Sequence, residues 1–143
     1  ALALVAAALN PRIQRIVAIY PFLSDFRRVL EIGNTSEAYD ELFRYFKFHD
    51  PFHETEEKIM ATLGYIDVKN FAHRIKGEVR MITGLDDDVC YPITQFAIYN
   101  RLTCETSYRL MPEYAHEAMN VHVNDQVYNW LCGSEIPFTY LGH

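Results

Sequence analysis

The chain has 143 residues, of which 50% are hydrophobic and 22% are charged, and its formal net charge is −6. This composition is typical of a globular domain and excludes a disordered segment. The acidic balance without any basic run gives no electrostatic support for binding nucleic acid, and no apolar stretch approaches the length of a transmembrane helix, so we expect neither nucleic acid nor a membrane as a partner.

The chain begins with ALALVAAALNP, an apolar stretch that favours a helix buried against a sheet. The stretch has no initiator Met, no capping residue and no acid in its first turn. The basic residues that precede the apolar region of a signal peptide are also missing. We therefore expect residue 1 to lie inside an element, and the chain to be the later part of a longer protein.

Three continuous apolar runs predict strands that are covered on both faces, at residues 15–21, 78–84 and 107–112. Apolar residues at helical spacing predict helices over residues 91–102 and 120–133. Strands that alternate with helices imply a doubly wound α/β sheet with right-handed crossovers. We expect residues 1–143 to belong to one domain.

A long insertion, residues 22–76, separates the first two predicted strands. Its sequence predicts three helices, over residues 24–33, 35–50 and 53–66. We expect caps at Ser24 or Asp25 for the first and at Thr35 or Ser36 for the second. The many Phe and Tyr residues are core or interface material in the first instance, and a helical excursion of this length usually forms a cap, a lid or a subunit contact.

Three acids in succession follow the second predicted strand, in TGLDDDVCYP: Asp86, Asp87 and Asp88. His116 follows the next strand, in PEYAHEAMN. Functional groups of open α/β sheets gather beyond the carboxyl ends of the strands, and adjacent strands lie about 4.8 Å apart, so an Asp and a His on these loops can meet. A carboxylate that accepts the Nδ1–H of an imidazole fixes its tautomer and stabilises the imidazolium. In α/β-hydrolases the nucleophile precedes the acid and the His, which would place it before the first helix.

Less specific interpretations of the same residues remain open. The Asp run can be a solvated loop in which Asp88 caps the helix that begins near Tyr91, and His116 can be a surface histidine. A metal site is conceivable, but no further ligand stands at a spacing typical of zinc or calcium.

Other reactive side chains lack the context that their chemistry needs. No serine stands in a G-x-S-x-G frame, so we expect no nucleophile among Ser24, Ser36, Ser107 and Ser134. Cys90 lies near Asp87, but a nucleophilic cysteine would need a strained elbow and a base positioned on it. The other histidines lie on predicted helical or terminal segments and are assigned no chemistry: His49, His53, His73, His122 and His143.

Five stretches, in order over nearly the whole chain, carry a family resemblance. ALALVAAAL is similar to a helix that follows a G-x-S-Q-G-G nucleophile elbow, and YPFLSDFRR matches P-F-L-x-x-F-R-R. TLGYIDVKNFAHRIKGEV matches (S/T)-L-x-Y-x-D-x-x-N-F-A-x-R-x-K, GLDDDVCYP matches G-L-x-D-x-x-C-x-P, and YAHE matches the end of a histidine loop. The sequence thus resembles carbohydrate esterase family 7, the acetyl xylan esterases and cephalosporin C deacetylases.

The resemblance implies an α/β-hydrolase fold, of which this chain is the C-terminal part with a helical insertion. It implies that Asp87 is the catalytic acid and His116 the general base of a Ser-Asp-His triad. The serine and the oxyanion-hole groups are expected before Ala1. The implied activity is removal of acetyl groups from small acetylated sugars, such as xylo-oligosaccharides, or from cephalosporin C, with no metal or organic cofactor.

The resemblance also bears on partners, location and the pocket. It implies that the N-terminal half of the same enzyme completes the site and that the protein forms a closed homo-oligomer, a hexamer. Three cysteines at wide spacing argue against a disulfide framework and, with the resemblance, indicate the cytoplasm. We expect Pro21, Phe22 and Val89 to line the acyl pocket, with Cys90 a small residue of its wall. The alternative is a non-catalytic, hydrolase-like interaction or structural module.

Overall fold

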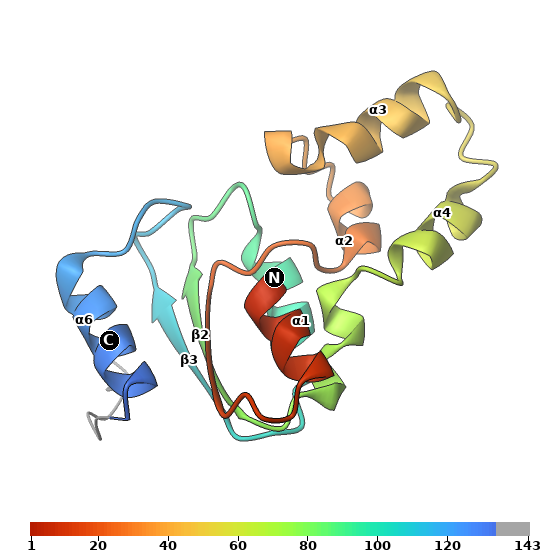
Figure 1. The fold of residues 1–143 in the computed structure, drawn as a ribbon. Helices are drawn as coiled ribbons and strands as arrows, with labels where there is room; N and C mark the ends of the chain where they lie inside the picture. The colour runs from red at the N-terminus through yellow and green to blue at the C-terminus, as the bar shows by residue number, and fades with distance from the viewer. Residues whose placement is uncertain (134–143) are drawn as a thin grey trace.

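A computed structural model describes residues 1–133, which build a three-stranded parallel sheet with helices on both faces (Figure 1). The strands are β1 (Arg15–Ile19), β2 (Glu78–Gly84) and β3 (Thr106–Met111). The α-helices are α1 (Leu2–Leu9), α2 (Phe26–Glu31), α3 (Asp40–Phe48), α4 (Glu56–Leu63), α5 (Pro92–Tyr99) and α6 (Val121–Leu131). Short 3-10 turns are η1 (Glu37–Tyr39), η2 (Val68–Asn70) and η3 (Ala72–Arg74). The predicted doubly wound α/β arrangement is confirmed.

The strand order is β1-β2-β3, and both pairs are parallel. The register aligns Gly84, the last residue of β2, with Met111, the last residue of β3. Because parallel strands end at the same edge of a sheet, the loops that follow β2 and β3 lie side by side. Two backbone bonds join these loops, Leu85 N–H to the Met111 carbonyl and Asp86 N–H to the Tyr114 carbonyl, both 3.1 Å.

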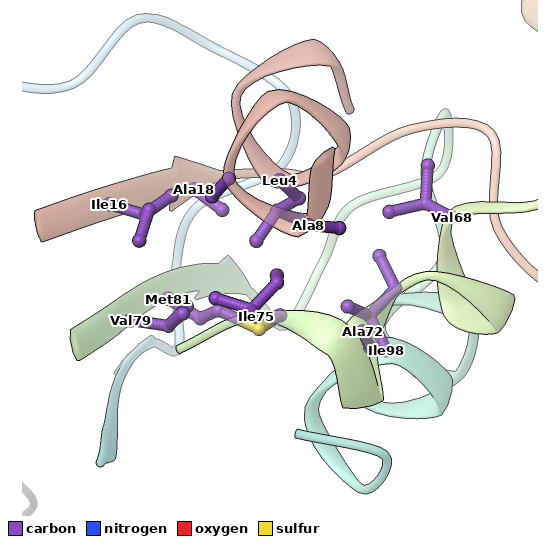
Figure 2. Close-up of a cluster of buried hydrophobic side chains, with 11 residues drawn as sticks. Leu4, Ala8, Ile16, Ala18, Val68, Ala72, Ile75, Val79, Met81 and Ile98 are labelled. Carbon is purple, nitrogen blue, oxygen red and sulfur yellow. The ribbon is translucent and has the colours of Figure 1, made fainter. Parts of the chain in front are cut away.

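The main core lies between the sheet and helix α1, and Figure 2 shows its side chains. Leu4, Ala7 and Ala8 of α1 are buried, whereas Leu2 and Leu9 are 83% and 59% exposed. Only one face of α1 therefore packs against the sheet, although the helix is apolar almost all round. Contiguous apolar side chains of β1 and β2 complete this core: Ile16, Ala18, Val79 and Met81. Helix α6 covers the opposite face through Val123.

Helices α2, α3 and α4 of the insertion pack around a core of their own, apart from the sheet (Figure 1). Phe26, Val29 and Tyr39 are the buried members of this core. The last part of the insertion, with Val68, Ala72 and Ile75, joins the main core. The helix predicted over residues 35–50 begins instead with η1, a 3-10 turn, before α3 takes over. Asp25 and Ser36 stand at the N-cap positions of α2 and η1, as predicted, but neither side chain accepts a capping bond from the helix that follows.

The cap of α2 comes from across the insertion. Buried Asp67 accepts the N–H groups of Asp25 (3.1 Å) and Phe26 (3.4 Å), and also that of Lys69 (3.0 Å). Lys69 in turn pairs with the carboxylate of Asp25, whose backbone is left-handed at φ 52°. A carboxylate at a helix N-terminus satisfies unpaired donors and complements the helix dipole.

We expect Asp67→Ala to lower the free energy of unfolding by about 2–3 kcal/mol, because it leaves several donors unpaired. Urea unfolding of the full-length protein measures the change. Asp40→Ala is the matched control, since within residues 1–133 the exposed Asp40 side chain makes only an ion pair with Arg44, at 3.8 Å. Equal stability of the two variants would show that Asp67 does not anchor the insertion.

Within residues 1–133, no helix combines the length and the apolar character that crossing a membrane requires.

Candidate active site

Of the three successive acids, the middle one points inward. Asp87 is 1% exposed, whereas Asp86 and Asp88 are exposed. The backbone folds back on the Asp87 carboxylate, whose Oδ1 accepts the N–H groups of Val89 (3.0 Å) and Cys90 (2.8 Å). Aspartate favours such local side-chain to backbone bonds, and these fix its rotamer. The sequence run therefore contains one structured acid between two solvated ones.

Asp88 does not cap the following helix. The residue before α5 is Tyr91, and no side-chain bond caps the helix there, so that part of the less specific interpretation is wrong. Pro92 begins α5 instead, at the position where its missing N–H costs nothing.

His116, on the loop after β3, meets the buried acid. Its Nδ1 lies 3.0 Å from Asp87 Oδ2 and 3.2 Å from Oδ1. Because an ionised carboxylate only accepts hydrogen bonds, Nδ1 carries the proton in this contact and Nε2 is left with a lone pair. The His116 side chain is 38% exposed, while that of Asp87 is fully buried. The pair is thus a buried acid that orients a partly exposed base.

Close backbone approach holds the histidine loop in place. A Cβ on Gly84 would lie 2.3 Å from the Tyr114 carbonyl oxygen and 2.6 Å from that of Ala115. Glycine therefore permits the histidine loop to cross the end of β2. The ring of Tyr20, whose φ of 45° is left-handed, packs against His116 with centroids 5.2 Å apart.

The insertion also forms hydrogen bonds to the loop that carries Asp87, called the acid loop below (residues 85–91). The buried Asn34 donates from Nδ2 to the Val89 carbonyl at 2.9 Å, and the Ser36 hydroxyl donates to the same oxygen at 3.3 Å. The Val89 N–H bonds to Asp87, and the Val89 carbonyl accepts the bonds from the insertion. Val89 therefore links the insertion to the acid.

A buried amide contacts the acid from α5. Gln95, 0% exposed, donates from Nε2 to Asp87 Oδ2 at 3.1 Å. No pattern in the sequence indicates this contact, because a glutamine within an amphipathic helix normally faces solvent. Tyr20 was missed in the same way, since it reads as the end of an apolar strand.

Two other ionisable groups near the pair are held neutral. Burial, and next the charge of Asp87, raise the pKa of the Cys90 thiol to about 12. Burial, followed by the charges of Glu117 and Asp87, raises the pKa of Tyr20 to about 12. Because the thiolate is the nucleophilic form of cysteine, Cys90 is inert at neutral pH.

The predicted pocket residues occupy different surroundings. Pro21 is buried, and Phe22 and Val89 are half-buried. The Phe22 ring packs against Tyr39 of the insertion core, with centroids 5.1 Å apart. Val89 belongs to the acid loop itself. A role for these residues in an acyl pocket stays a prediction.

Within residues 1–133, the serines and the other histidines make no hydrogen bond to Asp87 or His116. Ser24 is fully buried and Ser107 lies on β3. His53 pairs with Glu56 and stacks on Phe46. Ser134 and His143 lie outside the described residues. Within residues 1–133, no three metal-ligating side chains gather as a cation site would require.

Comparison with known proteins gives consistent matches. The family model described as acetyl xylan esterase matches residues 1–134. Acetyl esterase Axe7A of Xylanibacter ruminicola is 35% identical over 116 residues, which are 81% of this chain and 25% of that protein. Hydrolases 16–19% identical to the chain also match, with TM-scores of 0.51–0.63, and show the α/β-hydrolase fold alone.

Two solved structures are more similar. Acetyl xylan esterase 1 from Thermoanaerobacterium sp. JW/SL YS485 is 45% identical with a TM-score of 0.85, covering 91% of this chain and 41% of that chain. Acetyl xylan esterase from Paenibacillus sp. R4 is 38% identical with a TM-score of 0.85, covering 91% and 40%. The chain thus spans less than half the length of these relatives.

Proposed function

This chain belongs to the acetyl xylan esterase family, and we propose that it supplies the acid and the base of a serine esterase that removes acetyl groups. The observation that carries the proposal is the contact of His116 Nδ1 with Oδ2 of the buried Asp87, at 3.0 Å. Asp87 is the catalytic acid and His116 the general base. The nucleophilic serine belongs to a segment that precedes Ala1 in the full-length protein, as do the oxyanion-hole groups.

The chemistry follows from the tautomer of His116. Asp87 holds the proton on Nδ1, so Nε2 takes the proton of the serine hydroxyl as the serine oxygen attacks the ester carbonyl. The imidazolium then returns that proton to the leaving alcohol, and an acetyl-enzyme remains. Water repeats the sequence on the acetyl-enzyme and releases acetate. Throughout, the buried Asp87 carboxylate stabilises the positive charge on His116.

Small acetylated sugars, such as xylo-oligosaccharides, or cephalosporin C are the proposed substrates. The names of the relatives, which are acetyl xylan and acetyl esterases, support acetyl removal. The test is acetate release by the full-length enzyme from acetylated xylo-oligosaccharides and from cephalosporin C, with Asp87→Asn as the inactive control. Acetate from either substrate at rates that the control lacks supports the proposal. If a folded enzyme releases acetate from neither substrate, the proposal is overturned.

The N-terminal half of the same enzyme is the proposed partner of this chain. Among the described strands β1 lies at the edge of the sheet, and Ile19 at its end is 36% exposed. A parallel sheet edge with apolar neighbours requires covering. Helix α1, whose residues Leu2 and Leu9 are exposed, packs against this edge strand.

Homo-oligomer formation, with a hexamer as the expected state, belongs to the same proposal. The insertion exposes Phe48 (63%) and Phe52 (85%), and large exposed aromatic residues are typical of subunit contacts. Light scattering of the full-length enzyme measures the mass directly.

A cytoplasmic location is also proposed. Cys90, Cys104 and Cys132 are all free thiols in the structure, which suits a reducing compartment.

A further inference from the structure

Gln95 occupies an unusual position for a glutamine, inside the fold and against the acid. Its side chain, 0% exposed, enters from α5 and places Nε2 3.1 Å from Asp87 Oδ2 and 2.6 Å from the Cys90 carbonyl oxygen. Both of these atoms are hydrogen-bond acceptors. The amide therefore bridges the acid to the loop that carries it.

The direction of the Gln95 amide follows from its surroundings. If the amide were turned over, Oε1 would face a carboxylate oxygen and a carbonyl oxygen, and two acceptors would repel it. In the observed direction, Oε1 is buried and has no hydrogen-bond partner within residues 1–133. Leaving a buried acceptor unpaired costs about 1–3 kcal/mol. A buried polar atom without a partner needs an explanation, and here the two donations from Nε2, to Asp87 and to the Cys90 carbonyl, supply one.

Gln95 and His116 donate to the same carboxylate oxygen. Asp87 Oδ2 accepts from Gln95 Nε2 at 3.1 Å and from His116 Nδ1 at 3.0 Å, while the backbone N–H groups of Val89 and Cys90 occupy Oδ1. Each donor reduces the negative charge that the carboxylate can offer to the other. A donor such as Gln95 therefore weakens the stabilisation of the imidazolium form of His116.

We propose that Gln95 is a positioning residue that fixes the Asp87 carboxylate and sets how strongly it holds the proton of His116, and hence the pH at which the base becomes active. This inference rests on the proposed function, because it concerns the same acid and base. With Gln95 in place, His116 loses its second proton at a lower pH and is a competent base over a wider range.

Other polar groups face the Asp87–His116 pair, and a substitution at Gln95 leaves their chemical identity unchanged. The phenol of Tyr20, against the His116 ring, and the thiol of Cys90 are both held neutral by burial. The remaining ionisable groups on the two loops are Asp86, Asp88, Tyr91, Glu113, Tyr114 and Glu117. From the insertion, the phenol of Tyr39 interacts with the charge of Asp87. None of them is altered by a substitution at Gln95, so a changed pH response reports on the Gln95 donation.

The test is the titration of His116 in the full-length enzyme, read by NMR of ¹⁵N-histidine and assigned with His116→Gln. Gln95→Met keeps the size and removes the donor, and we expect the midpoint to rise by about half a pH unit. The acid limb of kcat/KM for 4-nitrophenyl acetate should move the same way. At neutral pH, we expect kcat/KM to fall about threefold to tenfold, because the carboxylate is less well fixed.

Gln95→Leu and Thr94→Val complete the design. The Gln95→Leu substitution also removes the donor at a similar size, so it should raise the midpoint as Gln95→Met does, and it carries the test if Gln95→Met fails to fold. Thr94 is a buried neighbour on α5 that donates only to the Tyr91 carbonyl, so Thr94→Val should leave the midpoint unchanged.

The outcomes separate the two claims. A raised midpoint in an enzyme without esterase activity would sustain the role of Gln95 and refute the proposed function. If activity is normal and the midpoints of Gln95→Met and Gln95→Leu equal that of Thr94→Val, the role of Gln95 is overturned.

Discussion

Replacing Asp87 by Asn should reduce turnover of an acetyl ester by about 10⁴-fold, as in serine triads generally. The asparagine oxygen can still accept the N–H groups of Val89 and Cys90, so the loop should keep its shape. The amide nitrogen then stands where Asp87 Oδ2 faces His116 and Gln95, both of which donate to it. Two donors cannot satisfy each other, so His116 must move its proton from Nδ1 to Nε2. That tautomer cannot accept a proton from the serine.

The neighbouring acids provide matched controls for this loss. Asp86→Asn and Asp88→Asn make the same chemical change at exposed positions of the same loop. We expect stability changes within about 0.5 kcal/mol and nearly full turnover for both. Hydrolysis of 4-nitrophenyl acetate by the three full-length variants, side by side, decides between the acids. An active Asp87→Asn next to an inactive Asp86→Asn or Asp88→Asn would mean that the wrong acid has been identified.

Removal of the base should be more damaging still. His116→Ala should lower kcat by about 10⁶-fold, and replacing the upstream serine as well should cost almost nothing more, because members of a triad act as one unit. His122→Ala is the control, since His122 is an exposed histidine on α6. If the losses of kcat from the His116 and serine substitutions multiply in the double variant, a shared mechanism is contradicted. Full activity of His116→Ala would favour the non-catalytic module.

The strands were predictable because their apolar runs are continuous, as burial on both faces of a parallel sheet requires. Their alternation with helices was enough to place Asp87 and His116 on neighbouring loops. The identity of the central acid came from the family resemblance alone. Position in the run did not distinguish it from Asp86 or Asp88, and the local bonds that turn it inward appear only in three dimensions.

The features that sequence reasoning missed all depend on long-range contacts. The cap of α2 was sought beside the helix, but Asp67 supplies it from a distant part of the insertion. Gln95 looked like one polar residue of an amphipathic helix, and its burial follows from the way α5 packs over the acid loop. Asn34 likewise bonds to a carbonyl more than fifty residues away. No local pattern encodes such partners, because propensity and periodicity report only on neighbours along the chain.

Whether Asp87 and His116 activate a serine is tested most directly by labelling the full-length enzyme with a fluorophosphonate and mapping the modified peptide by mass spectrometry. The serine oxygen displaces fluoride from phosphorus only when a base removes its proton. We predict one label per chain, on a serine that precedes Ala1 in the full-length protein, and a much slower reaction in Asp87→Asn and His116→Ala. No labelling of the folded enzyme, or a label on Ser24, Ser36, Ser107 or Cys90, would contradict the proposed mechanism.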